Sequence, residues 1–94
     1  MRCNWDEEKN RINRRKHGVD FEEAKTVFDD PLAVSIFDHE HSITEERWLT
    51  IGMSSQGQLW VVVHTHLVIN GEDLARIISA RRPTAHERRS YEED

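Results

Sequence analysis

The chain has 94 residues, 36% hydrophobic and 33% charged, which predicts one folded domain over residues 1–94 and leaves no room for two separate cores. Its single cysteine, Cys3, excludes an intramolecular disulfide, and no apolar run has the length of a signal peptide or membrane span, so we expect a cytoplasmic protein without membrane contact. The formal net charge of −5 disfavours nucleic-acid binding by the chain as a whole, although basic residues gather in segments 1–17 and 47–82 around an acidic segment, 18–46.

The first predicted element is a helix from Trp5 to His17. Asn4 or Asp6 can cap its start, acidic residues occupy its first turn and basic residues its last, and this order of charges opposes the helix dipole. Gly18 supplies the left-handed residue that ends the helix.

A second, shorter helix is predicted directly after this corner. Asp20 and Glu23 have the spacing of a capping box, and apolar residues then recur at intervals of three and four. The Asp-Asp-Pro run at 29–31 ends the helix, so the stretch RKHGVDFEEA forms a corner between two helices.

Four strands follow, in segments 32–37, 47–55, 58–66 and 74–81, with a charged loop at 38–46. Turn residues separate the last three strands, so the two central segments form an antiparallel hairpin. Thr84 and Glu87 form a second capping box, which predicts a C-terminal helix running toward Tyr91. The fold class is therefore α+β: two N-terminal helices, a four-stranded antiparallel sheet with one face covered by helices, and a C-terminal helix.

Three arginines stand near the end of the last predicted strand. Side chains alternate across a regular strand, so Arg76 is expected on the face opposite Arg81, while Arg82 lies at the exit and can turn either way. Guanidinium groups that converge there would bind phosphate, and the alternative is that all three are solvated charges at the rim.

Histidines offer two further kinds of chemistry. Lys16 and His17 suit the last turn of a helix for electrostatic reasons, but they could also supply charge and a transferable proton to a substrate. The pairs at 39/41 and 64/66 have an H-x-H spacing compatible with metal binding, yet no cysteine or third histidine completes a ligand set. We therefore expect no metal and no other cofactor.

Three long segments, WDEEKNRINRRKHGVDFEEAKTVFDDPLA, EERWLTIGMSSQGQLWVVVHT and RIISARRPTAHERRSYEE, resemble the BrnT family of toxins from type II toxin–antitoxin systems. The resemblance covers nearly the whole chain. It implies a RelE-like fold, an endoribonuclease activity that inhibits translation and growth, and neutralisation by a cognate antitoxin similar to BrnA. A hetero-oligomer with that antitoxin is expected, with two copies of each protein as one candidate arrangement.

The resemblance also implies functional residues and a reaction. We expect metal-independent attack of the RNA 2′-hydroxyl on the adjacent phosphorus, with guanidinium groups holding the developing charge. Lys16, His17, His64 and Glu46 are candidates for the acid and the base, with the two roles unassigned. The full catalytic set is Lys16, His17, Glu46, Arg47, His64, Arg76 and Arg81, and the expected RNA contacts are Lys9, Asn13 and Arg82.

Three other interpretations remain open at this stage. A non-enzymatic protein-interaction module would use the arginines to bind acidic partners. A metal-dependent nuclease would use the H-x-H pairs. A DNA-binding regulator is disfavoured, because no helix-turn-helix spacing or strongly basic helix is present.

Overall fold

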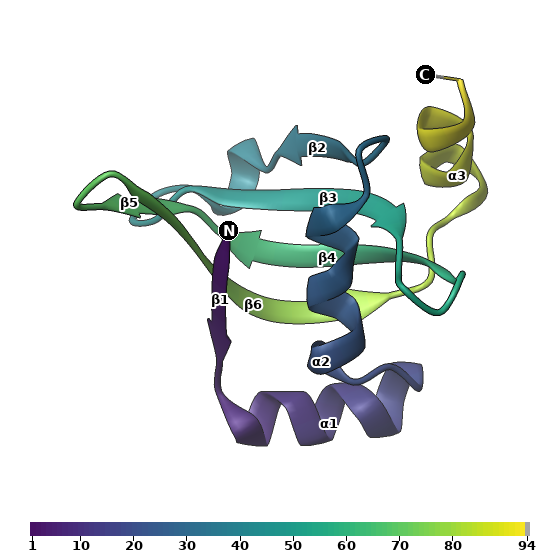
Figure 1. Ribbon diagram of the computed structural model, residues 1–94, viewed down its shortest axis with the longest axis horizontal. Helices are drawn as coiled ribbons and strands as arrows, with labels where there is room; N and C mark the ends of the chain where they lie inside the picture. The colour runs from purple at the N-terminus through teal and green to yellow at the C-terminus, as the bar shows by residue number, and fades with distance from the viewer. Residues whose placement is uncertain (94) are drawn as a thin grey trace.

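A six-stranded sheet organises the fold, and the computed structural model describes residues 1–93 (Figure 1). Within that range no helix is long and apolar enough to cross a membrane. The strands are β1 (Arg2–Trp5), β2 (Val34–Phe37), β3 (Arg47–Met53), β4 (Leu59–Thr65), β5 (Leu67–Ile69) and β6 (Glu72–Arg81). The helices are α1 (Glu7–His17), α2 (Phe21–Ala24) and α3 (Ala85–Glu92), with 3₁₀ turns η1 (Lys25–Asp29) and η2 (His39–His41).

The α+β class is confirmed, but the prediction of a four-stranded, wholly antiparallel sheet was wrong. The strand order is β1-β6-β4-β3-β2, and β5 pairs with the outer part of β6. β1 runs parallel to β6, with Arg2 opposite Leu74 and Trp5 opposite Ile77, whereas the remaining pairs are antiparallel. The N-terminal strand β1 therefore forms one edge of the sheet, and the other strands come much later in the chain.

Helix α1 ends at the predicted residue, His17, but begins later than predicted. The carboxylate of Asp6 accepts hydrogen bonds from the backbone N–H of Glu8 at 2.8 Å and of Lys9 at 3.3 Å. Gly18 ends the helix at φ 75°, a left-handed conformation that glycine adopts without steric cost. The helix begins at Glu7 rather than Trp5, because the residues before it are paired in β1.

Asp20 caps α2, but it does not form the predicted capping box with Glu23. Its side chain accepts from the N–H of Glu22 at 2.9 Å, and this hydrogen bond, followed by the one from Arg14, lowers the pKa of the Asp20 carboxyl. The Glu23 carboxylate points toward the sheet instead, where it accepts from Trp60 Nε1 at 2.8 Å. A long-range partner has replaced the local one.

The central hairpin and the last capping box are confirmed. β3 and β4 pair continuously from Arg47 opposite Thr65 to Met53 opposite Leu59. At the start of α3, the Thr84 hydroxyl and the Glu87 carboxylate satisfy each other's backbone N–H groups.

A β-bulge in β6 alters the arrangement of its side chains. Val63 pairs with Ser79, but the next residue of β4, His64, pairs with Ile77, so Ile78 has no partner on β4. Such an extra residue shifts the alternation of side chains beyond it by one position.

The bulge therefore changes which face of the sheet the side chains at the end of β6 point to. Ile77 and Ala80 both belong to the same core cluster, although a regular strand would place them on opposite faces. By the same shift Arg81 comes onto the face of Arg76, contrary to the expectation for a regular strand.

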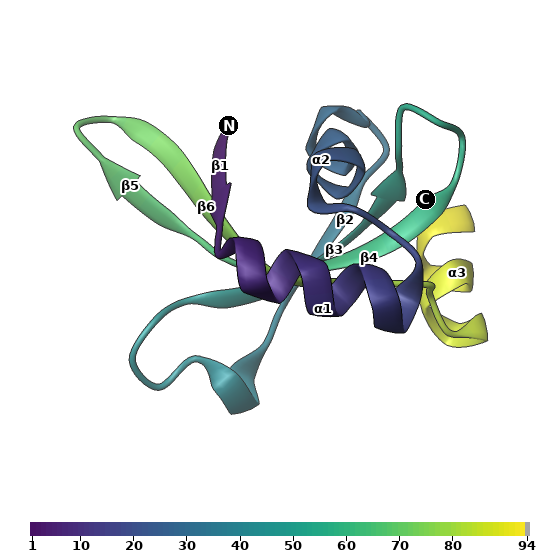
Figure 2. The ribbon, with the colours of Figure 1, turned by 90° about the horizontal axis from the view of Figure 1, so that it is seen from below.

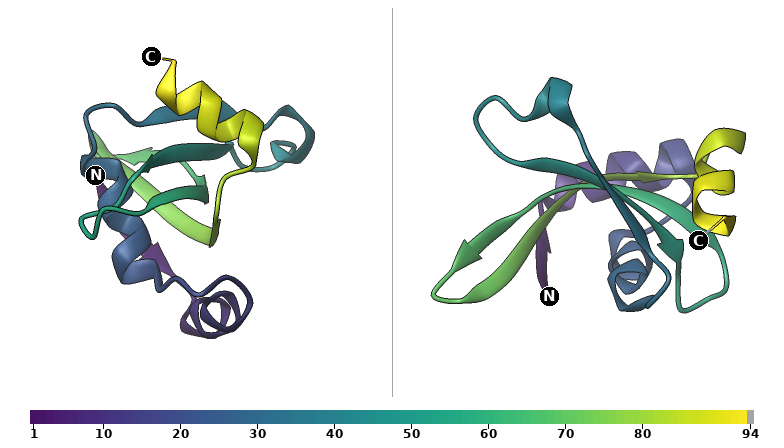
Figure 3. Two further views of the ribbon diagram at one scale, coloured as in Figure 1. Left: turned by 90° about the vertical axis from the view of Figure 1, so that its right-hand side faces the viewer. Right: turned by 90° about the horizontal axis from the view of Figure 1, so that it is seen from above.

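The sheet has a core on each face. On one face α2 and η1 pack against Trp60, Val62 and Ile77, and on the other Tyr91 of α3 packs against Ile51 and Val61. Consecutive β4 residues thus supply different cores, as the alternation of a buried strand requires. Figure 3 shows the helices around the twisted sheet.

Candidate functional site

Four predicted site residues lie along one groove between α1 and β6. The groove has a volume of about 240 Å³ and is lined by Lys9, Asn13, Lys16 and His17 of α1, with Ile78 and Ser79 of β6 opposite them. The helical residues recur at intervals of three, four and seven, so they share one face of α1. The bulged residue Ile78 faces this surface, which makes the irregular part of β6 one wall of the groove.

The groove carries positive charge that no carboxylate neutralises. Across residues 1–93, Lys9 and Lys16 make no ion pair, and both side chains are exposed. His17 is half-buried beside them and ends the helix. Two free ammonium groups and an imidazole on one wall suit a phosphate-bearing ligand.

Asn13 lines the groove and also holds α1 against β6. Its side chain is 5% exposed, and its amide accepts from Ala80 N–H at 3.0 Å and donates to the Ala80 carbonyl at 2.9 Å. It also donates to the carbonyl of Val19 at 3.3 Å. The amide thus takes the place of a neighbouring strand where β1 has ended. The expected RNA contact of Asn13 stays a prediction. Figure 2 shows α1 lying along this edge of the sheet.

Arg76 and Arg81 do not form the expected cluster, although the bulge brings them to one face. They are five residues apart on β6, roughly 15 Å at strand spacing. Arg76 Nη2 donates to Glu45 at 2.7 Å, with both side chains about half exposed. Arg81 donates twice to Glu87, at 2.8 and 2.9 Å, in a pair that is largely shielded from solvent.

The Arg81–Glu87 pair joins β6 to α3. The hydrogen bonds from Arg81 hold the pKa of the Glu87 carboxyl at about 2, and the same pairing raises the pKa of Arg81. A guanidinium bound in this bidentate way stabilises the fold, and its N–H groups are occupied by the carboxylate. Arg82 is also directed elsewhere, since its guanidinium lies 5.5 Å from the ring centroid of Trp60.

His64 is buried in a chain of hydrogen bonds. It is 3% exposed; its Nδ1–H donates to the Thr65 carbonyl at 2.9 Å, so Nε2 of the neutral ring accepts from the Thr50 hydroxyl at 2.7 Å. The Thr50 oxygen in turn lies 2.8 Å from the hydroxyl of Ser35, which is exposed. Burial lowers the pKa of His64, and both ring nitrogens are engaged within the protein. The expected role of His64 as a catalytic acid or base stays a prediction.

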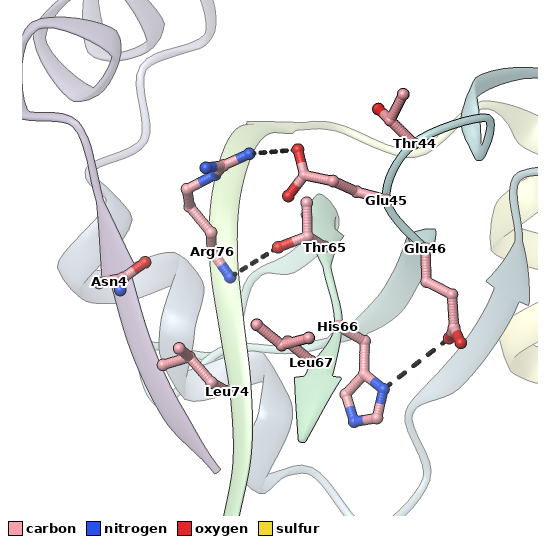
Figure 4. Close-up of a pocket in the computed structure, with 9 residues that line it drawn as sticks. All are labelled: Asn4, Thr44, Glu45, Glu46, Thr65, His66, Leu67, Leu74 and Arg76. Atoms are coloured by element: carbon pink, nitrogen blue, oxygen red, sulfur yellow. Dashed lines mark hydrogen bonds and ion pairs between the residues drawn. The ribbon is translucent and has the colours of Figure 1, made fainter. Parts of the chain in front are cut away.

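A second, larger cavity of about 410 Å³ lies between the β5–β6 arm and the 38–46 loop (Figure 4). Glu46, Arg76 and Thr65 contribute to its lining, so two predicted residues meet here, apart from the α1 groove. Arg47 pairs with Thr65 in the β3–β4 register and therefore shares its face of the sheet.

The H-x-H pairs do not build a metal-ligand set. His41 bonds Asp38 at 2.9 Å and His66 bonds Asp73 at 2.9 Å, while His64 is held by Thr50. In residues 1–93 no three His, Cys, Asp or Glu side chains are grouped to hold a metal ion.

Several lining residues could not be found from the sequence. Ser79 and Ile78 reach the groove because of the bulge, and no local pattern predicts a bulge in RIISAR. Asn4 reaches the larger cavity only because β1 pairs with β6. The groove itself could be found in the sequence from the spacing of Lys9 and Lys16, which places both on one face of the helix.

Comparison with known proteins agrees with the resemblance stated from the sequence. A family model described as a ribonuclease toxin, BrnT, of type II toxin–antitoxin systems matches residues 5–87, which include α1 and almost the whole sheet. No curated protein matches the chain. The chain therefore belongs to the BrnT family of ribonuclease toxins and is an RNA-cleaving enzyme.

Proposed function

We propose that the protein cleaves RNA without a metal ion, by attack of a 2′-hydroxyl on the adjacent phosphorus, with the scissile phosphate bound in the α1 groove. The observation that carries this proposal is the pair of free ammonium groups, Lys9 and Lys16, beside the imidazole of His17. These are the only predicted site residues that line one groove and keep their cationic side chains free of carboxylates within residues 1–93.

The reaction follows from the chemistry of those groups. A base takes the proton of the 2′-hydroxyl, the 2′-oxygen bonds to phosphorus, and the bond to the 5′-oxygen breaks as that oxygen takes a proton. The products are a 2′,3′-cyclic phosphate and a free 5′-hydroxyl. Imidazole exchanges protons near neutral pH and suits one of these transfers, so we assign it to His17. Lys9 and Lys16 stabilise the added negative charge of the phosphorane.

Arg76 is the guanidinium best placed to assist. Its ion pair with Glu45 is half exposed, and pairs of this kind contribute only about 0.2–1 kcal/mol, so a phosphate can replace the carboxylate. Arg47, without an ion pair in residues 1–93, is a further candidate contact on the same face. Arg81 holds α3 in place and is assigned no direct contact.

The consequences for the cell belong to the same proposal. Cleavage of RNA in the cytoplasm stops translation and growth, and a cognate antitoxin covers the cationic groove and prevents entry of RNA. A complex with two toxins and two antitoxins is one arrangement that would bury both grooves.

The test is induction of the chain in bacteria with and without its neighbouring open reading frame, followed by mapping of RNA ends. The expected result is growth arrest, rescued by the neighbour, with new ends that carry 2′,3′-cyclic phosphate. Purified protein should keep its activity in EDTA. Activity abolished by EDTA and restored by a divalent cation would contradict the metal-independent mechanism.

A further inference from the structure

The larger cavity has a different electrostatic character from the groove. Its two acidic side chains, Glu45 and Glu46, outnumber its one arginine, and Arg76 is already paired with Glu45. The carboxylate of Glu46 has no arginine or lysine partner within residues 1–93, and its contact with a basic group is with His66 (Figure 4). While the Arg76–Glu45 pair is intact, such a wall favours a neutral group rich in N–H donors over a phosphate.

The carboxylate of Glu46 is also held in a defined orientation. Trp48 Nε1–H donates to its Oε1 at 3.0 Å, and His66 Nδ1 lies 3.9 Å from the same oxygen. Within residues 1–93 its Oε2 receives no hydrogen bond. The acceptor is thus positioned before a ligand arrives, which reduces the entropy lost on binding.

An apolar wall completes the cavity. Leu67 and Leu74 are paired in the β5–β6 register, and both line it. The volume of about 410 Å³ falls in the lower part of the ~300–1,000 Å³ range of small-ligand sites. A cavity with an apolar wall and an oriented carboxylate suits a flat heterocycle with polar edges.

We propose that this cavity binds a guanine base of the RNA substrate and that Glu46 recognises its Watson–Crick edge. Guanine alone among the four RNA bases presents two adjacent N–H donors, N1–H and the 2-amino group. They match Oε2 of Glu46 and the lone pair of Oε1 that Trp48 does not occupy. Adenine and cytosine place a ring-nitrogen lone pair beside their amino group, and uracil places carbonyls on both sides of its N–H, so each would repel the second oxygen.

The position of the cavity relative to the groove supports this assignment, which rests on the proposed function. β6 is a wall of both: Arg76 lines the cavity, and Ile78, two residues further on, lines the groove. Two residues of strand span roughly 7 Å. Glu46 precedes β3, which β4 separates from β6, so it lies about two strand spacings, roughly 10 Å, across the sheet from β6. A single-stranded RNA with a phosphate beside Lys9 and Lys16 can place a nearby base at this distance.

The experiment compares cleavage of single-stranded RNAs that differ at one base: guanine, inosine, which lacks only the 2-amino group, or adenine. Wild-type protein is expected to cleave beside guanine at least about tenfold faster than beside inosine or adenine. Glu46→Gln should cleave all three at similar rates. Glu40→Gln, an exposed carboxylate in the same loop that does not line the cavity, should keep the guanine preference.

A parallel measurement separates this proposal from the proposed function. Binding of the same RNAs, with a 2′-O-methyl group that blocks cleavage, is measured by fluorescence anisotropy. Preference for guanine in binding without cleavage of any RNA would support the cavity and overturn the nuclease mechanism. Cleavage without base preference, or a preference that survives in Glu46→Gln, would overturn the guanine site. So would a Glu46→Gln variant that keeps guanine preference but no longer binds the antitoxin, because the cavity would then serve a protein partner.

Discussion

Arg81 at the end of β6 donates two hydrogen bonds, 2.8 and 2.9 Å long, to the carboxylate of Glu87 in the first turn of α3. Glu87 also caps the helix by accepting from the N–H of Thr84 at 2.8 Å. One carboxylate thus fixes both the start of α3 and its attachment to the sheet. A residue that the sequence suggests as catalytic is in this way a structural link.

The first prediction concerns this link. Glu87→Gln should lower the free energy of unfolding by about 1.5–3 kcal/mol, because it weakens charge-assisted hydrogen bonds in a shielded pair. RNA cleavage per folded molecule should stay within about twofold of wild type. Urea unfolding and a cleavage assay on the same preparation measure both. Loss of cleavage with unchanged stability would instead place Arg81 in the active site.

The same pair predicts a dependence of stability on pH. The pKa of Glu87 is about 2 in the folded protein against 4.5 ordinarily, so the unfolded state binds more protons between these values. The stabilisation is complete above pH 4.5 and is lost as the pH falls toward 2. Acid titration of unfolding free energy should show a shallower loss in this window for Glu87→Gln than for wild type. Identical slopes would contradict the assignment.

Asn13 provides the third prediction. Asn13→Ala removes three hydrogen bonds and leaves the buried N–H and C=O of Ala80 unpaired, so it should destabilise the fold by about 2–4 kcal/mol. Ser55→Ala, at an exposed turn, is the matched control and should change stability by less than about 0.5 kcal/mol. Thermal unfolding measures both. A direct RNA contact would show the opposite pattern, with stability kept and RNA affinity lost.

His64 provides the fourth prediction. Burial lowers its pKa below the ordinary 6.5, so the folded protein holds the ring neutral while the unfolded chain takes up a proton. Its contribution to stability is present above pH 6.5 and is lost as the pH falls below that value. Unfolding free energies between pH 7.5 and 5.5 should therefore decrease more for wild type than for His64→Gln. An equal decrease in the two proteins would show that His64 does not titrate with unfolding.

The local features of the fold could be predicted because their causes lie within a few residues of one another. Asp6 and Gly18 bound α1, and Thr84 with Glu87 begins α3, by contacts along the chain. β1 was hidden because RCNW is short and polar and pairs with a strand about seventy residues away. Pairing with a parallel strand so far along the sequence produces no recognisable pattern of apolar and polar residues in either segment.

The candidate site was predictable to the extent that it depends on helical spacing. Lys9, Lys16 and His17 share a face of α1, and the structure brings them to one groove. The expected guanidinium cluster failed because carboxylates in the 38–46 loop and in α3 bind Arg76 and Arg81. Tertiary packing determines which carboxylates reach these arginines. Sequence spacing alone cannot predict whether an arginine binds such a carboxylate or a phosphate.

The most direct test of the account is the RNA cleavage rate of the double variant Lys16→Ala/His17→Ala, measured together with its melting temperature. Arg15→Ala, an exposed arginine in the same helical turn that does not line the groove, is the control. The account predicts a loss of at least about 100-fold in rate for the double variant, with a melting temperature close to that of the control. Full activity at an unchanged melting temperature would contradict it and remove the α1 groove from the active site.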